Sequence, residues 1–103
     1  MTAVLITVDT ELSALLHQRG VSAADNLASS IEGRTPAGQF GTGWMIDRLD
    51  AAGLTGVFFV DPMPALVYGD QVIADIVGPI VARGHEVQLH LHSEWLEWAK
   101  DPP

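Results

Sequence analysis

The sequence contains no cysteine among its 103 residues. This absence excludes a disulfide framework and any metal site that is built on thiolates. Basic residues are also scarce, because only five Lys and Arg stand against 13 Asp and Glu, which gives a formal net charge of −8. Nucleic acids and anionic membrane surfaces are bound through cationic faces, so we expect neither of them as a partner.

Long hydrophobic runs are absent as well. Hydrophobic residues make up 48% of the chain, which is too many for a disordered chain, yet they are too dispersed for a membrane span. The first apolar run, 3–6, follows no basic segment or cleavage site and is soon ended by Asp9 and Glu11. We interpret it as a strand rather than a signal peptide. The expectation is therefore a cytoplasmic protein, with residues 1–103 forming a single domain.

Three short apolar segments predict buried β-strands. They are 3–9 (AVLITVD), 54–61 (LTGVFFVD) and 85–92 (HEVQLHLH). Helical patterns separate them, so the order strand, helix, strand, helix, strand is expected. This order predicts an α/β fold with parallel strands, right-handed crossovers and helices on the faces of the sheet.

Two segments carry the helical patterns. The segment 42–53 is predicted to form a helix with Thr42 as its N-cap. The segment 67–84 has apolar residues at intervals of four, which is typical of a helix face. Pro79 interrupts this pattern, so we expect a kink or a break near Gly78.

The region before the second strand is less regular. The segments 12–19 and 23–31 are compatible with short helices, and 33–43 (GRTPAGQFGTG) is predicted to be a loop. The sequence GQFGTG within that loop lacks the Lys-Ser/Thr ending of a phosphate-binding loop, so we do not assign it a phosphate.

Polar side chains gather where the predicted strands end. These positions carry Asp9, Glu11, Asp61, His90 and His92. Sites in parallel α/β folds lie beyond the carboxyl ends of the strands. Alternation along the strands places Asp9 and Glu11 on one face of the first strand, and His90 and His92 on one face of the third. Carboxylates and imidazoles that converge there suit a divalent metal and a general base. Asp61 is also open to a simpler interpretation, because Asp-Pro is common in turns.

Three segments together resemble a known family. TVDTE (7–11), GVFFV (56–60) and GHEVQLHLH (84–92) are similar, in order and in spacing, to motifs of the polysaccharide deacetylase family, also called the NodB-homology domain or carbohydrate esterase family 4. The resemblance implies that the chain is the N-terminal portion of a distorted (β/α) barrel. It further implies removal of acetyl groups from a carbohydrate with a divalent metal, commonly zinc.

The resemblance assigns roles to individual residues. Asp9 matches the family's general base for the attacking water, whereas Thr10 stands where the family usually has a metal-ligating Asp. Glu11 points to the same face as Asp9 and is the candidate replacement ligand. His90 matches the first ligating histidine, and Glu94 occupies the place of the second. The predicted metal set is therefore Glu11, His90 and Glu94, with a hard divalent ion acceptable to both carboxylates.

A substrate-binding role is expected for two further residues. His92 shares the face of His90, and Trp95 belongs to an aromatic group with Trp98 that could form a wall for a sugar ring. The same tryptophans could instead be core or interface residues.

The later motifs of the family do not occur in this chain, which has roughly half the length of a typical barrel domain. Three parallel strands cannot close a barrel. We therefore expect a fragment of a longer product, or a chain that is completed by forming a homo-oligomer. In either case we expect the isolated monomer to have no turnover. Two alternatives stay open: a non-catalytic carbohydrate-binding or interaction module with a degenerate metal site, and a small metal-binding protein whose motif match is accidental.

Overall fold

The computed structural model describes residues 2–99 and contains the three predicted strands. Strands β1 (Ile6–Thr10), β4 (Gly56–Val60) and β5 (Glu86–Leu89) form a parallel sheet in the order β1-β4-β5. Each strand is shorter than the sequence predicted. The parallel arrangement is confirmed, with Val8 opposite Phe58 and Phe58 opposite Val87 in the register.

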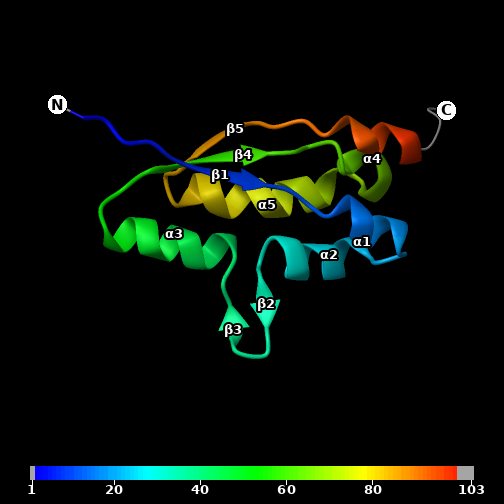
Figure 1. The fold of residues 1–103 in the computed structure, drawn as a ribbon, viewed down its shortest axis with the longest axis horizontal. Coiled ribbons are helices and arrows are strands. Elements are labelled where there is room, and N and C mark those ends of the chain that lie inside the picture. Colours follow the sequence, from blue (N-terminus) through cyan, green and yellow to red (C-terminus); the bar gives the residue numbers. More distant parts are fainter. Residues whose placement is uncertain (1, 100–103) are drawn as a thin grey trace.

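The helices are α1 (Ala14–Gln18), α2 (Ala23–Ser30), α3 (Thr42–Ala51), α4 (Ala65–Tyr68), α5 (Asp70–Ala82) and the 3-10 helix η1 (Ser93–Trp98). Helices α3 and α5 lie on the same face of this sheet, whereas α1, α4 and η1 lie beyond the ends of its strands (Figure 1). The sequence led us to expect helices on both faces. A chain that crosses a parallel sheet in a single direction with crossovers of one hand places every connection on the same side. No helix within residues 2–99 is long and apolar enough to cross a bilayer.

The hydrophobic core forms between the sheet and the helices. Phe58 on the central strand is completely buried, and Ile76 and Ile80 on α5 pack into the same cluster with Ile46 from α3. The spacing of four between Ile76 and Ile80 places both on one helix face. Each such burial contributes about 1.5–3 kcal/mol. Within residues 2–99 no helix covers the opposite face of the sheet (Figure 1). Asp9 points to that face by alternation and is exposed.

The predicted break in the 67–84 helix lies elsewhere. Gly69, with a φ of 89°, separates α4 from α5, and α5 then runs without interruption past Gly78 and Pro79. Pro79 removes one helical hydrogen bond. The loss is tolerated because Gly78 and Pro79 are exposed and stand near the end of the helix, where water can reach the freed carbonyl of Asp75.

Two further local predictions are corrected. The predicted loop 33–43 contains a short antiparallel hairpin, β2 (Arg34–Thr35) and β3 (Gly38–Gln39). Thr42 is the first residue of α3 rather than its N-cap, and Gly41 precedes it. Gly41 is required there because a Cβ would lie 1.9 Å from the carbonyl oxygen of Ile31.

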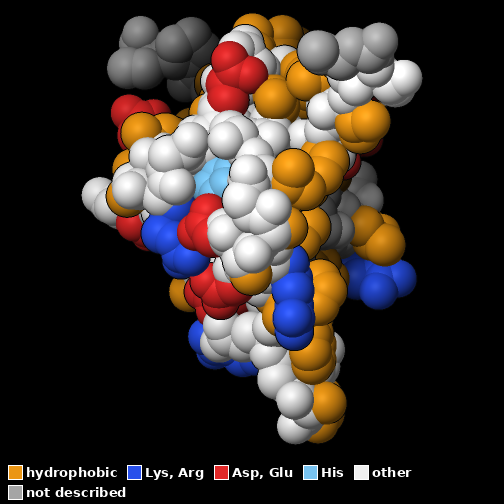
Figure 2. All heavy atoms as spheres, turned by 90° about the vertical axis from the view of Figure 1, so that its left-hand side faces the viewer, with side chains coloured by type: hydrophobic (Ala, Val, Ile, Leu, Met, Phe, Trp, Pro, Cys, Tyr) orange, Lys and Arg blue, Asp and Glu red, His pale blue; other side chains and the backbone are white. Residues whose placement is uncertain are grey.

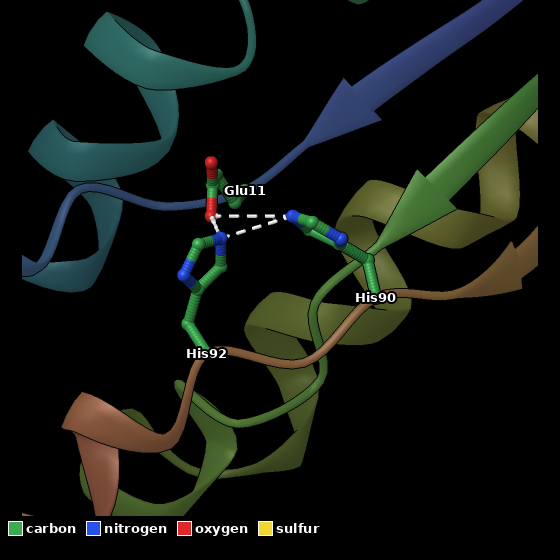
Figure 3. Close-up of side chains that lie close together, drawn as sticks. All are labelled: Glu11, His90 and His92. Atoms are coloured by element: carbon green, nitrogen blue, oxygen red, sulfur yellow. Dashed lines mark hydrogen bonds and ion pairs between the residues drawn. The ribbon is translucent and has the colours of Figure 1, made fainter.

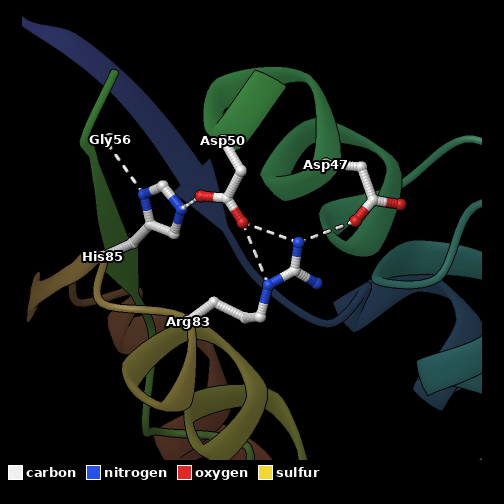
Figure 4. Close-up of polar contacts among 5 residues, drawn as sticks. All are labelled: Asp47, Asp50, Gly56, Arg83 and His85. Atoms are coloured by element: carbon white, nitrogen blue, oxygen red, sulfur yellow. Dashed lines mark hydrogen bonds and ion pairs between the residues drawn. The ribbon is translucent and has the colours of Figure 1, made fainter. Parts of the chain in front are cut away.

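A polar network joins α3, α5 and the start of β4 (Figure 4). The buried imidazole of His85 accepts a hydrogen bond from the Gly56 N–H through Nδ1 (3.0 Å), so its hydrogen is on Nε2, which donates to Asp50 at 2.8 Å. Arg83 donates to both Asp50 (2.6 Å) and Asp47 (2.9 Å). Figure 2 shows acidic and basic side chains around a histidine on this end of the molecule. His85 thus links the start of β4 to α3.

This network predicts how stability depends on pH. The hydrogen bond from His85, followed by that from Arg83, holds the pKa of Asp50 below its ordinary value of 3.8. A lowered carboxyl pKa stabilises the fold above the ordinary value, and this contribution is lost as the pH falls through the lowered pKa. We expect Asp50→Asn to be less stable than the natural protein above pH 3.8. Urea unfolding followed by tryptophan fluorescence should show the difference shrink at lower pH, and a difference that is constant with pH would contradict the prediction.

Candidate metal centre

Three side chains from two strand ends converge beyond the carboxyl edge of the sheet. Glu11 follows β1 directly, and His90 and His92 follow β5. The backbone of His90 continues the parallel ladder, because its N–H donates to the Val60 carbonyl at 3.1 Å. Residues two apart in an extended chain project to the same side, which is why His90 and His92 face Glu11 together. This common face was predicted from the alternation of the sequence.

The ligand atoms of the three residues lie close together (Figure 3). Their nitrogen and oxygen atoms are all within 4.8 Å of one another. The two Nε2 atoms of His90 and His92 are 2.9 Å apart, and Oε2 of Glu11 lies 2.5 Å from the Nε2 of His92 and 3.9 Å from that of His90. Two imidazole nitrogens that face each other at this distance can share only one hydrogen, so at least one lone pair points into the cluster.

This donor set fits a divalent ion such as zinc. Ligand atoms about 2.0–2.2 Å from a tetrahedral zinc lie roughly 3.3 Å from one another. The observed separations of 2.5, 2.9 and 3.9 Å fall on both sides of that value, so small side-chain rotations suffice. Two histidines and one carboxylate leave the fourth position open, which is the arrangement of catalytic rather than structural zinc sites. We call Glu11, His90 and His92 the metal group.

An open pocket of about 490 Å³ adjoins the metal group. Glu11 and His92 belong to its lining together with residues of α1 and η1, including Gln18 and Trp98. This volume lies in the range of small-molecule sites. A second pocket of about 430 Å³ lies among α2, α3 and α5 and contains no member of the metal group. The first pocket therefore combines space for a ligand with metal-binding side chains.

The structure changes the membership of the predicted metal set. Glu94 is exposed on η1 and lies outside the metal group, although it lines the same pocket. His92, which was expected to bind substrate, takes its place. The reason is local: the chain leaves the extended conformation at Ser93 and turns into η1, so Glu94 does not continue the alternation that brings His90 and His92 to Glu11. Asp9, the expected base, is exposed on the open face of the sheet and is not a member of the group.

The two tryptophans have different environments. Trp95 was expected to bind substrate, but only 1% of its surface is exposed, so its ring has no free face for a sugar. It packs beside His17, Tyr68 and Trp98 at ring distances of 5.5 to 6.0 Å. The interpretation of Trp95 as a core residue is therefore correct. Trp98 is partly buried and lines the pocket, which leaves it as the aromatic side chain available to a ligand.

The chain matches no protein-family model, no curated protein and no solved structure. The resemblance to the polysaccharide deacetylase family thus depends on the three short motifs alone.

The metal group predicts that Zn²⁺ binding depends on Glu11, His90 and His92 and not on Glu94. We expect the protein to bind about one Zn²⁺, and we expect His90→Ala and His92→Ala to weaken binding by more than the roughly 10–100-fold that is typical of outer-shell changes. Glu11→Gln should weaken it as well, because it removes the anionic ligand. Titration calorimetry on metal-stripped protein measures these affinities. Glu94→Gln is the matched control and should bind as the natural protein does; a loss equal to that of Glu11→Gln would restore Glu94 to the ligand set.

Proposed function

We propose that the chain is the N-terminal portion of a metal-dependent hydrolase domain that removes acetyl groups from a carbohydrate, as in the polysaccharide deacetylase family. The observation that carries this proposal is the metal group of Glu11, His90 and His92 at the carboxyl edge of a parallel sheet, beside an open pocket. Zinc is the proposed ion, since two imidazoles and one carboxylate form a ligand set that zinc commonly has.

The proposed chemistry divides between the ion and the protein. When bound, the ion supplies Lewis-acid activation of water and of the acetyl carbonyl. Glu11, His90 and His92 would hold it. Asp9, on the same face of β1 as Glu11, takes the proton from the attacking water. Asp9 suits this task because its carboxylate is exposed and free to approach a substrate that lies over the edge of the sheet.

The pocket supports a sugar-sized ligand. Its lining includes the indole of Trp98, whose apolar face can stack on a sugar ring. It also includes Gln18, which can donate hydrogen bonds to hydroxyl groups and accept them, and Glu94, which can accept them. An acetylated carbohydrate seated there would bring its acetyl group toward Glu11 and His92 at the pocket wall.

We propose that further strands complete the sheet in the active form. The sheet has an open edge at β5, where Leu89 is 65% exposed and Leu91 is 58% exposed. Exposed strand edges of this kind normally pair with further strands. We propose that the form with turnover contains these strands, supplied by a second copy of the chain or by a longer product of the same gene. Its activity is therefore to be assayed in each assembly state separately.

We expect turnover to require Asp9, whereas metal binding should not require it. We expect zinc-loaded protein in its assembled form to release acetate from N- or O-acetylated sugar oligomers. Asp9→Asn should lower the rate by about 10²–10⁴-fold, because it removes the base, while the zinc affinity stays unchanged. Chromatographic acetate measurement gives the rate, and calorimetry gives the affinity. Robust turnover by a proven monomer would contradict the requirement for a partner.

Substrate binding should depend on Trp98. Trp98→Ala is expected to weaken the binding of an acetylated sugar oligomer about tenfold, which corresponds to about 1.4 kcal/mol, because a stacking face is lost. Trp44→Ala is the matched control, since Trp44 is exposed on α3 away from this pocket. Binding of both zinc and sugar without acetate release in any assembly state would support the alternative of a non-catalytic carbohydrate-binding module. Binding of neither would overturn both functions.

A further inference from the structure

The hydrogen bonds of the sheet continue one residue beyond the assigned strands. The N–H of Asp61 donates to the Thr10 carbonyl at 3.2 Å, and the N–H of His90 donates to the Val60 carbonyl at 3.1 Å. Extending the register of the three strands by this one step places Asp61 between Glu11 and His90. The central strand thus ends in a carboxylate that stands between two members of the metal group.

Asp61 is completely buried, which is rare for a carboxylate. Its Oδ1 accepts a hydrogen bond from the Met63 N–H at 2.9 Å, as an aspartate does in an ordinary turn. Its Oδ2, however, is the buried side-chain atom within residues 2–99 that has no hydrogen-bond partner. The turn accounts for one oxygen and leaves the other unexplained.

The side chain of Asp61 is shut off from water. This environment is unfavourable for an isolated negative charge, because burial removes the water that would solvate it. A cation held by Glu11, His90 and His92 would compensate that charge, since the interaction between charges is strong where water is excluded.

We propose that Asp61 serves the metal centre as a buried carboxylate that supplies a second negative charge beside the ion. The inference rests on the proposed metal site. Asp61 lies outside the metal group and so is not assigned as a ligand. With Glu11 it provides two negative charges, which equal the charge of a divalent cation. The unpartnered Oδ2 and the ladder position between Glu11 and His90 are the observations that carry the proposal.

A simple turn residue would behave differently. Asparagine supports the same turn as aspartate, because its side-chain oxygen also accepts from the backbone two residues on. Asp61→Asn therefore keeps the turn and removes only the charge. If Asp61 serves the turn alone, this substitution leaves metal binding unchanged. If Asp61 serves the metal centre, metal binding falls, while the metal-free protein is as stable as the natural one or more stable, because a buried charge without a partner has been removed.

The experiment compares metal affinity and metal-free stability. Zn²⁺ and Co²⁺ are titrated into metal-stripped natural protein, Asp61→Asn and Asp75→Asn at neutral pH. Asp75 is exposed on α5 and provides the matched loss of one charge at a remote position. We expect Asp61→Asn to bind both ions about tenfold more weakly or worse, with a changed Co²⁺ absorption spectrum, and Asp75→Asn to bind within about twofold of the natural protein. Urea unfolding of the metal-free proteins gives their stabilities.

Unchanged affinity and an unchanged Co²⁺ spectrum in Asp61→Asn would overturn the proposal. If Asp61→Asn does not fold, Asp61→Ser takes its place, because a serine hydroxyl also supports this turn. If both variants are unfolded without metal, their affinities are read from the Zn²⁺ concentration at which they refold. Failure of both to refold in excess Zn²⁺, while His90→Ala folds, would make Asp61 a folding residue and refute the proposal.

The same titration separates this inference from the proposed function. Absence of Zn²⁺ and Co²⁺ binding in the natural protein would refute the metal centre itself. Binding by the natural protein, lost in His90→Ala and retained at full strength in Asp61→Asn, would refute the role of Asp61 alone.

Discussion

The parallel register of β1, β4 and β5 is the constraint on which the rest of the structure depends. Parallel strands must all end at the same edge, so Glu11 is brought to His90, 79 residues further along the sequence, without direct pairing between β1 and β5. A slip of one residue would turn each polar side chain to the opposite face. The core enforces the register, because Phe58 and Val60 must face α5 for their side chains to be buried.

The two ends of the sheet carry polar groups of different character. At the amino end, His85 is satisfied on both nitrogens and joins β4 to Asp50 on α3, a complete arrangement that stabilises one conformation. At the carboxyl end, His90 and His92 face each other and Glu11, and Asp61 has an oxygen without a partner. Buried or clustered polar groups without full hydrogen bonding cost free energy, and such groups are typical of sites that bind something.

Several local predictions from the sequence succeeded because they depended on short-range rules. Alternation along 84–92 put His90 and His92 on one face, and the order of elements predicted parallel strands. The motif match proposes Glu94 as a ligand, but the chain turns into η1 at Ser93, and the structure places Glu94 outside the group formed by Glu11, His90 and His92. The sequence left two interpretations of Trp95 open, since its burial depends on α4 and on the ring of Tyr68, which no local pattern reports.

The sequence by itself determined the class of fold, the absence of thiolate chemistry and the residue types available at the carboxyl ends of the strands, because composition and periodicity follow from local chemistry. Tertiary structure decided which of those residues meet. It selected His92 over Glu94, placed Trp95 in the core, and set Asp61 in full burial between Glu11 and His90. These outcomes depend on where each strand stops and what packs over its end, and those are properties of contacts between segments that lie far apart in the chain.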